Sequence, residues 1–215
     1  MKLVTAFLRS RPSAAPSFSS GKYWDERYAH GGNSGPGSYG HLARFKADML
    51  NAFVREHAVA SVIEFGCGDG NQLALAQYPR YAGYDISAAA LALCRDRFAG
   101  DSTKEFFLAA DYDQRQADLA LSLDVIFHLT EDDVYEAYMR TLFAASRRYV
   151  AVYSSDRDEP ASPGSIHVRH RAFTRWVDAQ SGSPWTLVRK VSNAYPYDGD
   201  YHATSFSDFY FYEKR

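Results

Sequence analysis

The stretch Val62-Ile63-Glu64-Phe65-Gly66-Cys67-Gly68-Asp69-Gly70-Asn71 decides the fold. Its apolar start, within residues 61–65, is typical of a short buried strand. Three alternate glycines follow directly. Gly66 permits a tight turn, whereas Gly68 and Gly70 remove side chains where a ligand would touch the backbone. The stretch therefore predicts a strand, a ligand-contacting loop and then a helix.

Strand-like and helical patterns alternate on both sides of this loop. Strands are predicted over residues 61–65, 81–86, 104–111, 117–123, 148–155, 185–195 and 206–214. Helices are predicted over 41–57, 73–78, 88–98, 130–146 and 171–180, with Ser87 and Thr130 as candidate caps. Alternation of this kind implies right-handed βαβ units, and the last two strands, without a helix between them, should pair antiparallel. We expect an α/β, Rossmann-like three-layer sandwich with a seven-stranded, mostly parallel sheet and one antiparallel strand.

Length and composition indicate one globular domain with an N-terminal extension. The 215 residues are 46% hydrophobic and 23% charged. We expect a flexible tail over residues 1–20, an N-terminal arm and lid helix over 21–58, and a core over 59–215. The net charge of −2 disfavours a dedicated nucleic-acid binder, and no apolar run is long enough to span a membrane. The only cysteines, Cys67 and Cys94, show no metal-site spacing and fit a reducing compartment, so we expect a cytoplasmic protein.

A second signal accompanies the glycine loop and indicates a nucleoside ligand. Asp85 ends the second strand, where a carboxylate can accept hydrogen bonds from both hydroxyls of a ribose. The loop reads GxGxG rather than the dinucleotide pattern GxGxxG, with Asn71 in the next position. Glu64 would repel a pyrophosphate but suits a cationic group. Both departures favour S-adenosylmethionine, which carries a sulfonium and an ammonium and no phosphate.

On these residues the sequence resembles the class I S-adenosylmethionine-dependent methyltransferases, most clearly over residues 60–150. The resemblance implies that the methionine part lies against Gly66, Cys67 and Gly68, with Glu64 toward its amino group. It further implies that Asp85 holds the ribose and that Ile86 packs on the adenine. The remaining implied cofactor contacts are Asp111 and Tyr112 beside the adenine, Ser122 and Leu123 near the methionine part, and Tyr23 and Tyr39 from the N-terminal arm.

Three of these residues also have a purely structural interpretation. Glu64 could cap a helix, Asp111 could simply end a strand, and Cys67 is best interpreted as a small packing residue rather than a nucleophile. The high aromatic content, 15%, suits a ring-shaped ligand such as a sugar, but tyrosine also fills ordinary β-sheet cores.

Histidines supply the candidate catalytic groups. Methyl transfer to a hydroxyl needs positioning and a base, and histidine is the usual choice near neutral pH. His128 lies just past the fourth strand, and the alternative is that it only bridges two loops. Asp124 could orient His128, contact the cofactor or substrate, or cap the turn.

The segment 165–176 is the second candidate region. His167 and His170 could assist catalysis, and Arg169 and Arg171 suit an anionic or polyhydroxylated acceptor. The two histidines, three residues apart, could instead bind a metal, for which no third ligand is evident, so a divalent metal stays uncertain. A solvated basic helix start is the remaining alternative.

The N-terminal arm combines aromatic residues with the glycine-rich run GGNSGPGSYG at residues 31–40. The resemblance implies a lid over the cofactor, and the alternative is a glycine linker. The arm, His128 and the 165–171 segment together are similar to small bacterial methyltransferases of polysaccharide type.

We therefore expect O-methylation of a sugar or glycan hydroxyl, or of another small polar acceptor, with His128 as general base. N-methylation of an amine or amino sugar is the alternative. An NAD-dependent oxidoreductase, a non-catalytic binding module and an RNA methyltransferase are less favoured. The acceptor, the methylated atom and the oligomeric state are left open.

Overall fold

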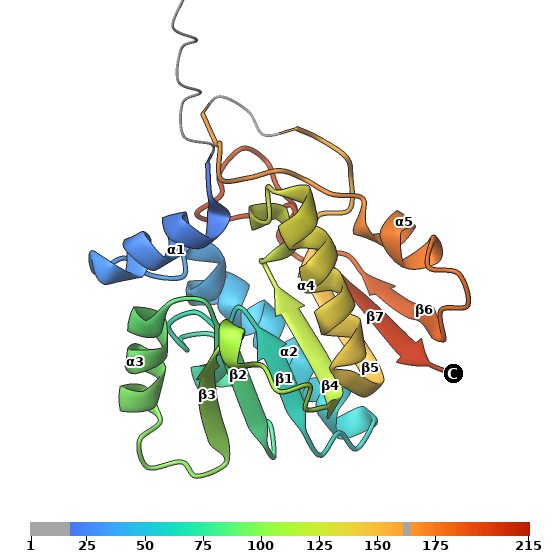
Figure 1. Cartoon of the computed structure of the whole chain (residues 1–215), viewed down its shortest axis with the longest axis horizontal. Helices are drawn as coiled ribbons and strands as arrows, with labels where there is room; N and C mark the ends of the chain where they lie inside the picture. The colour runs from blue at the N-terminus through green and yellow to red at the C-terminus, as the bar shows by residue number, and fades with distance from the viewer. Residues whose placement is uncertain (1–17, 161–163) are drawn as a thin grey trace, which may run out of the picture.

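The computed structural model describes residues 18–160 and 164–215, and they form a sandwich with helices on both faces of one sheet (Figure 1). The expected tail over residues 1–17 lies outside the described residues. Ser19 and Ser20, by contrast, belong to the start of the first helix: Ser19 caps it by accepting from the backbone N–H of Lys22, and Ser20 is buried.

The sheet has the predicted seven strands, in the order β3-β2-β1-β4-β5-β7-β6. They are β1 (Val62–Phe65), β2 (Tyr81–Asp85), β3 (Lys104–Leu108), β4 (Ala117–Leu123), β5 (Ser146–Ser154), β6 (Trp185–Val191) and β7 (Asp208–Lys214). β7 pairs antiparallel with both β5 and β6, so it alone runs against the other strands. The α/β fold predicted from the sequence is confirmed. Strand order reverses between β1 and β4, which is where ligands bind in such sheets.

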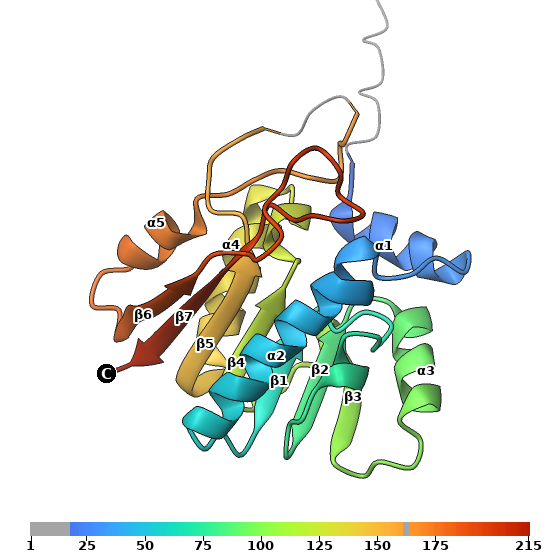
Figure 2. The same cartoon turned by 180° about the vertical axis from the view of Figure 1, so that it is seen from behind.

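The helices divide between the two faces of the sheet. They are α1 (Ser20–Ala29), α2 (Gly40–Glu56), α3 (Ala88–Arg97), α4 (Asp132–Ala144) and α5 (Phe173–Asp178). Figure 2 shows α2 lying across the face that α4 does not cover. α1, the helix that begins the described chain, was not predicted as a helix. None of the helices in the described ranges is both long and apolar enough to cross a membrane.

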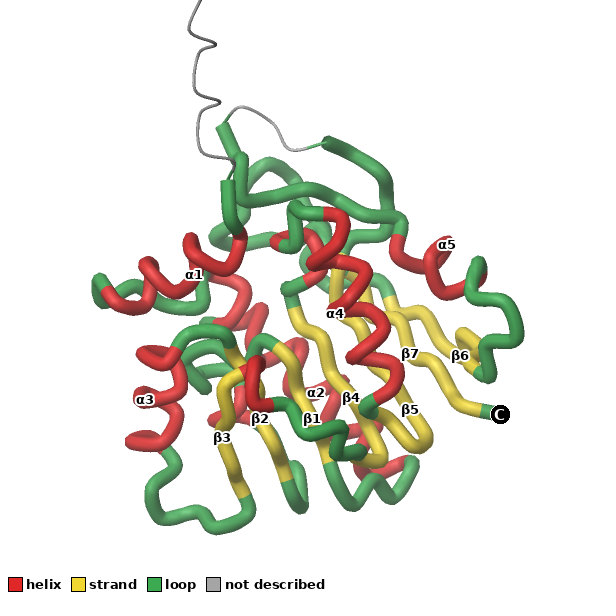
Figure 3. Tube along the Cα trace, viewed as in Figure 1, coloured by secondary structure: helices red, strands yellow, loops and turns green. Residues whose placement is uncertain are grey.

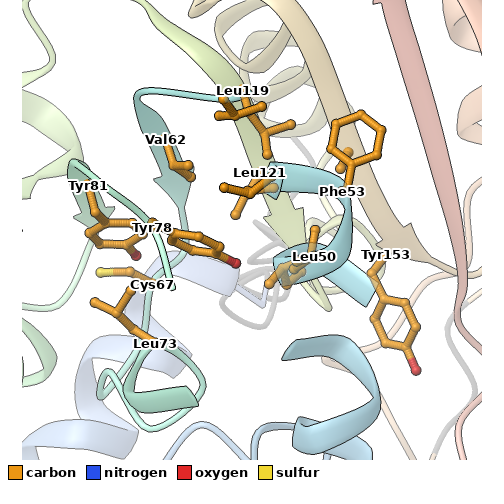
Figure 4. Packing of buried hydrophobic residues seen from close by; sticks show 14 of the residues in the cluster. Leu50, Phe53, Val62, Cys67, Leu73, Tyr78, Tyr81, Leu119, Leu121 and Tyr153 are labelled. Atoms are coloured by element: carbon orange, nitrogen blue, oxygen red, sulfur yellow. The ribbon is translucent and has the colours of Figure 1, made fainter. Parts of the chain in front are cut away.

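Two apolar clusters hold these layers together. Leu50, Phe53 and Val54 of α2 pack with Val62 of β1 and Leu119 of β4, as Figure 4 shows for part of this cluster. On the opposite face, buried side chains of α4 and α5 pack against the same strands; they include Met139, Leu142, Phe143, Phe173 and Val177. The helix predicted over residues 41–57 is therefore confirmed as α2, and its apolar face packs on the core.

The helix predicted over residues 73–78 is wrong. The chain makes only a 3-10 turn at Leu73–Leu75 and then extends at Ala76. The side chain of Asn51 in α2 donates to the carbonyl oxygen of Leu75 at 3.0 Å and accepts from the N–H of Gln77 at 2.8 Å. These bonds satisfy the backbone groups of residues 75 and 77 without a helix, and α2 occupies the space beside β1.

Smaller differences concern the ends of elements. The third strand ends at Leu108, and Ala109–Asp111 form a 3-10 turn instead of its last residues. The sixth strand stops at Val191, before the predicted end at residue 195. Thr130 does not cap α4, because its hydroxyl donates to the side chain of Glu131, which stands at the N-cap position without a capping hydrogen bond of its own.

Candidate active site

A cavity of about 1040 Å³ opens at the carboxyl ends of the parallel strands. Its walls come from α1 and the glycine-rich arm, from the loops after β1, β2, β4 and β5, and from the loop between β6 and β7. These loops gather at one edge of the sheet, close to α1, in both opposite views and in the loop-coloured tube (Figures 1, 2 and 3). The described residues therefore form a large cavity where the topology predicts a ligand site.

Most of the predicted site residues line this cavity. They are Tyr23, Glu64, Gly66, Cys67, Gly68, Asp85, Ile86, Leu123, Asp124, His128, His167 and His170. The predicted residues that do not line it are Tyr39, Asp111, Tyr112, Ser122, Arg169 and Arg171.

The glycine loop brings bare backbone to the floor of the cavity. Gly66 and Gly68 have φ angles of 87° and 58°, in the left-handed region that favours glycine. A Cβ atom on Gly66 would lie 2.5 Å from the side chain of Val125, and one on Gly68 would lie 2.3 Å from the hydroxyl of Ser34. Side chains are thus excluded at both positions by conformation and by space.

The carboxylate of Asp85 is buried at the end of β2 and fixed by the loops beside it. Its Oδ2 accepts from the N–H of Gly68 at 2.9 Å, and its Oδ1 accepts from the N–H of Ser87 at 2.9 Å. Burial raises the pKa of Asp85, and the backbone N–H groups oppose that effect. Each oxygen retains a lone pair that can accept a further hydrogen bond from a ligand.

Glu64 is buried in β1 at the cavity wall. The hydroxyl of Tyr81 donates to its Oε2 at 2.7 Å. Burial raises the pKa of Glu64 to about 7, the hydrogen bond from Tyr81 and the charge of Lys46 act to lower it, and Asp85 adds to the rise. A cation placed beside such a buried carboxyl group lowers its pKa and favours the charged form.

The arm is bonded to the glycine loop through Asp69. Its Oδ2 accepts from the hydroxyl of Tyr39 at 2.7 Å and from the N–H of Ser34 at 3.0 Å. Burial acts to raise the pKa of Asp69, but the hydrogen bonds from Tyr39, Asn71 and Ser34 outweigh it and lower the pKa. Tyr39 therefore fastens the arm to the glycine loop and does not itself reach the cavity.

A buried ion pair joins α2 to the end of β4. Nζ of Lys46, only 1% exposed, lies 2.7 Å from Oδ2 of Asp124, and the hydroxyl of Ser207 donates to Oδ1 at 3.0 Å. Asp124 has a φ of 58°, so the chain turns sharply as β4 ends. Sequence reasoning missed Lys46, although its position one helical turn from both Leu42 and Leu50 was a readable signal of burial.

His128 is oriented by the segment after β5. Its Nδ1 lies 2.9 Å from the carbonyl oxygen of His167, and since a carbonyl only accepts, Nδ1 carries the proton in the neutral ring. The unprotonated nitrogen is then Nε2. Desolvation lowers the pKa of His128 to about 4, the hydrogen bond to His167 opposes it, and the charge of His167 adds to the fall.

Aromatic rings from α1 enclose this histidine. Trp24 meets the ring of His128 edge-on at 4.7 Å, and Tyr23 stacks on His167 at 4.9 Å. The rings of His128 and His167 are themselves stacked at 5.7 Å. Tyr23 thus reaches the cavity beside the histidines.

His170 has both ring nitrogens engaged. Arg157 can only donate, so the contact of its Nη2 with Nε2 at 3.1 Å makes Nε2 the acceptor. Nδ1 then donates to the hydroxyl of Ser155 at 2.7 Å. His170 is a neutral ring that positions Arg157 and has no free nitrogen for a base or metal ligand.

Arg169 and Arg171 are turned away from the cavity toward the start of α4. Both pair with Asp132, and both donate to the carbonyl oxygen of Thr130, while Arg171 also donates to that of Leu129. Their guanidinium groups join the post-β5 segment to α4, which accounts for the basic run seen in the sequence.

The other predicted residues outside the cavity have identifiable surroundings. Ser122 is buried and accepts from the hydroxyl of Tyr138 at 2.8 Å. Tyr112 packs edge-on against Phe65 and donates to the carbonyl oxygen of Arg115. Asp111 is exposed on its 3-10 turn, and Ala109 is the residue of that turn that lines the cavity.

No group of three histidine, cysteine, aspartate or glutamate side chains that could hold a metal ion occurs among the described residues. Sequence reasoning also missed several cavity residues that are distant from the glycine loop in the sequence: Arg27, Tyr138, Arg157, Tyr197 and Tyr201.

Comparison with known families decides the class of protein. A family profile described as a methyltransferase domain matches residues 39–188, which include the glycine loop, Asp85 and His128. The chain belongs to this methyltransferase family. The methyltransferase is thus of the class I, S-adenosylmethionine-dependent kind that the sequence resembles.

Solved structures confirm the fold of the methyltransferase. Magnesium protoporphyrin IX methyltransferase (ChlM) from Synechocystis PCC 6803, solved with bound SAM, matches with a TM-score of 0.64 at 14% identity, over 94% of this chain and 100% of that one. The methyltransferase domain of bacterial CtHen1-C matches with a TM-score of 0.62 at 19% identity, over 80% and 98%.

The N-methyltransferase NodS from Bradyrhizobium japonicum WM9 matches with a TM-score of 0.60 at 14% identity, over 80% and 94%. No curated protein sequence matches the chain significantly.

Proposed function

We propose that this methyltransferase transfers a methyl group from S-adenosylmethionine to a hydroxyl of a small polar acceptor, with a sugar or glycan favoured and His128 as general base. The observation that carries the proposal is the hydrogen bond between Nδ1 of His128 and the carbonyl oxygen of His167. It leaves Nε2 as the unprotonated nitrogen of a side chain that lines the cavity.

The residues of the inner cavity fit the donor. Backbone at Gly66 and Gly68 offers close contact to the methionine part, and Asp85 has lone pairs for two ribose hydroxyls. Ile86, 48% exposed and lining the cavity, offers an apolar face to the adenine. Glu64 supplies negative charge for the ammonium group.

Arg27 completes the donor site in this proposal. Its Nε donates to the carbonyl oxygen of Asn33 at 2.7 Å, and its guanidinium lies 5.5 Å from the ring centre of Trp24. Within residues 18–160 and 164–215 it forms no ion pair, although it lines the cavity. The methionine carboxylate is the group of the donor that such a cation would bind.

The transfer needs a proton acceptor for the hydroxyl. S-adenosylmethionine supplies an electrophilic methyl carbon on its sulfonium. As the acceptor oxygen forms the new C–O bond, the C–S electron pair passes to sulfur and the hydroxyl proton becomes strongly acidic. Nε2 of His128 takes that proton, which the ring later releases to water. A histidine with a pKa near 4 is a sufficient base for a proton of this acidity and is neutral at pH 7.

The arm acts as a cover in this proposal. α1 contributes Tyr23 and Trp24 to the cavity wall, and residues 34–38 line the cavity while Ser34 bonds to Asp69. A cover of this kind excludes water from the sulfonium and fixes the histidines.

The test compares His128→Gln with the unchanged enzyme, using labelled S-adenosylmethionine against nucleotide sugars, oligosaccharides and amines. We expect the variant to lose about 10²–10⁴-fold in transfer rate to a hydroxyl. Its affinity for S-adenosylhomocysteine should change less than about twofold, which shows that the donor site is intact. Full retention of rate with an amine acceptor would contradict the O-methylation proposal and identify N-methylation instead.

A further inference from the structure

We infer that the outer half of the cavity is a subsite for an uncharged sugar ring, with Tyr197 and Tyr201 as the stacking surface and the Arg157–Glu159 pair as the hydroxyl-binding groups. The inference rests on the proposed function, because it names the acceptor of that same site. It concerns the β6–β7 loop, residues 192–207, and the start of the post-β5 segment.

The two tyrosines are exposed although the loop that carries them is well anchored. Tyr197 is 48% exposed and Tyr201 is 61% exposed, and both line the cavity. Aromatic rings left in water are a source of binding free energy when a ligand covers them. The faces of these rings suit the C–H face of a sugar, which is apolar and similar in width.

Hydrogen bonds fix the shape of this loop. Asn193 is buried and donates to the carbonyl oxygen of Ser207 at 3.0 Å. Across the loop, the N–H of Ser205 donates to the carbonyl oxygen of Tyr195 at 2.9 Å. From α2, Nε2 of His41 lies 2.7 Å from the carbonyl oxygen of Ala203. The aromatic surface is therefore held in place before a ligand arrives, which lowers the entropy cost of binding.

Phe206 forms the apolar base of the subsite. It meets Tyr197 edge-on at 6.0 Å, Phe127 at 4.9 Å and His170 at 4.7 Å. The guanidinium of Arg157 lies 5.7 Å from its ring centre. Phe206 thus connects the loop after β6 with the histidine-bearing wall.

The charges at this end of the cavity are already balanced, which determines the kind of acceptor. Nε of Arg157 lies 2.9 Å from Oε1 of Glu159, and its Nη2 is held by His170. Arg169 and Arg171, which the sequence offered as anion-binding groups, pair with Asp132 outside the cavity. Three arginine and lysine side chains line the cavity within the described residues: Lys46 pairs with Asp124, Arg157 pairs with Glu159, and Arg27 is the cation that the proposed function assigns to the methionine carboxylate. With the donor bound, none of the three is left over for a carboxylate or phosphate of the acceptor.

A paired arginine and glutamate still bind hydroxyls. The guanidinium has further N–H donors, and the carboxylate has further lone pairs, so together they can donate to and accept from neighbouring hydroxyls of one ring. An anionic ring would meet Glu159 without a free cation to offset the repulsion. The geometry thus favours a neutral hydroxylated ring over a uronic acid or a sugar phosphate.

The experiment uses the full chain and three probes: methyl α-glucopyranoside, its uronate counterpart and phenol. Binding of each is titrated by ligand-observed NMR, with and without saturating S-adenosylhomocysteine. We expect the neutral glycoside to bind at least about fivefold more tightly than the uronate and more tightly than phenol.

Variants locate the binding. Tyr197→Ala and Tyr201→Ala should each weaken binding of the glycoside about fivefold, as expected for loss of a ring contact. Tyr201→Phe should retain the affinity. Tyr195→Ala is the matched control, because Tyr195 lies in the same loop but packs on His41 and does not line the cavity.

The inference is overturned if no binding of the glycoside is detected at glycoside concentrations up to about 100 mM. It is also overturned if the uronate or phenol binds more tightly than the glycoside, or if the alanine variants keep full affinity. Binding of S-adenosylhomocysteine separates this result from the proposed function. A chain that binds the nucleoside but not the glycoside contradicts only the acceptor subsite, whereas a chain that binds no nucleoside contradicts the methyltransferase site itself.

Discussion

Nδ1 of His128, just past β4, lies 2.9 Å from the carbonyl oxygen of His167 in the segment after β5. This bond joins two loops that are far apart in the sequence and selects one tautomer of the imidazole. The two interpretations of His128 in the sequence, a base or a bridge between loops, are therefore compatible, because the hydrogen bond that bridges the loops also orients the side chain proposed as the base.

The first prediction concerns the pH dependence of this histidine. Its folded pKa, about 4, lies below the ordinary value of 6.5. The neutral ring stabilises the fold fully above pH 6.5, and that contribution is lost as the pH falls from 6.5 through 4. Thermal unfolding should therefore show a steeper loss of Tm over this window in the unchanged chain than in His128→Gln. Equal slopes would contradict the assigned burial.

The second prediction is proton release from Glu64 when the donor binds. Its folded pKa, about 7, lies above the ordinary value of 4.5, so its contribution to stability is full below pH 4.5 and is lost as the pH rises to 7. An ammonium group beside Glu64 lowers that pKa again. Calorimetry of S-adenosylhomocysteine binding at pH 7, in buffers of different ionisation enthalpy, should show release of about half a proton. Glu64→Gln should abolish the release.

The third prediction separates two predicted cofactor carboxylates. Asp85→Asn should weaken binding of S-adenosylhomocysteine by about 10–100-fold, because it removes the charge from hydrogen bonds to the ribose. Asp111→Asn, on an exposed turn outside the cavity, should change the affinity by less than about twofold. Isothermal titration measures both. Equal effects would mean that the adenine end of the site reaches beyond the cavity.

The fourth prediction concerns the ion pair of Lys46 and Asp124. Lys46→Met leaves Asp124 with the hydroxyl of Ser207 but without its cation, and we expect a loss of about 3 kcal/mol in the free energy of unfolding. Lys190→Met is the control, since Lys190 pairs with Asp208 at the surface, where its side chain is 51% exposed. That variant should lose less than about 1 kcal/mol. Denaturant unfolding measures both, and similar losses would show that burial of Lys46 has no energetic effect.

The parts of the fold that follow from local pattern were predictable. Alternating strands and helices define the parallel sheet, and the glycine loop with Asp85 requires the carboxyl ends of β1 and β2 to lie together. His128 could be placed at the same edge because it directly follows β4. Predictions of this kind need only the order of elements along the chain.

The parts that failed depend on contacts between distant residues. The helix expected over 73–78 is replaced by a turn because the side chain of Asn51 bonds to the backbone of that segment. Asn51 lies in α2, and the whole of β1 separates it from the segment in the sequence. Arg169 and Arg171 pair with Asp132 outside the cavity, and nothing in their own segment indicates that partner. Tyr197 and Tyr201 lie in a loop whose position depends on α2 and β7.

The position of α2 limits how far this enzyme can be truncated from its N-terminal side. The helix precedes the glycine loop in the chain, yet it covers the sheet beside β1, where the 73–78 segment makes only a turn. It also carries Lys46, which pairs with Asp124 at the end of β4. Truncation at the first strand would remove α2 from the face that it shares with α3 and leave Asp124 without its counter-ion. A minimal catalytic fragment of this protein must therefore begin before Gly40, and exchange of N-terminal segments between relatives would alter the core as well as the entrance to the site.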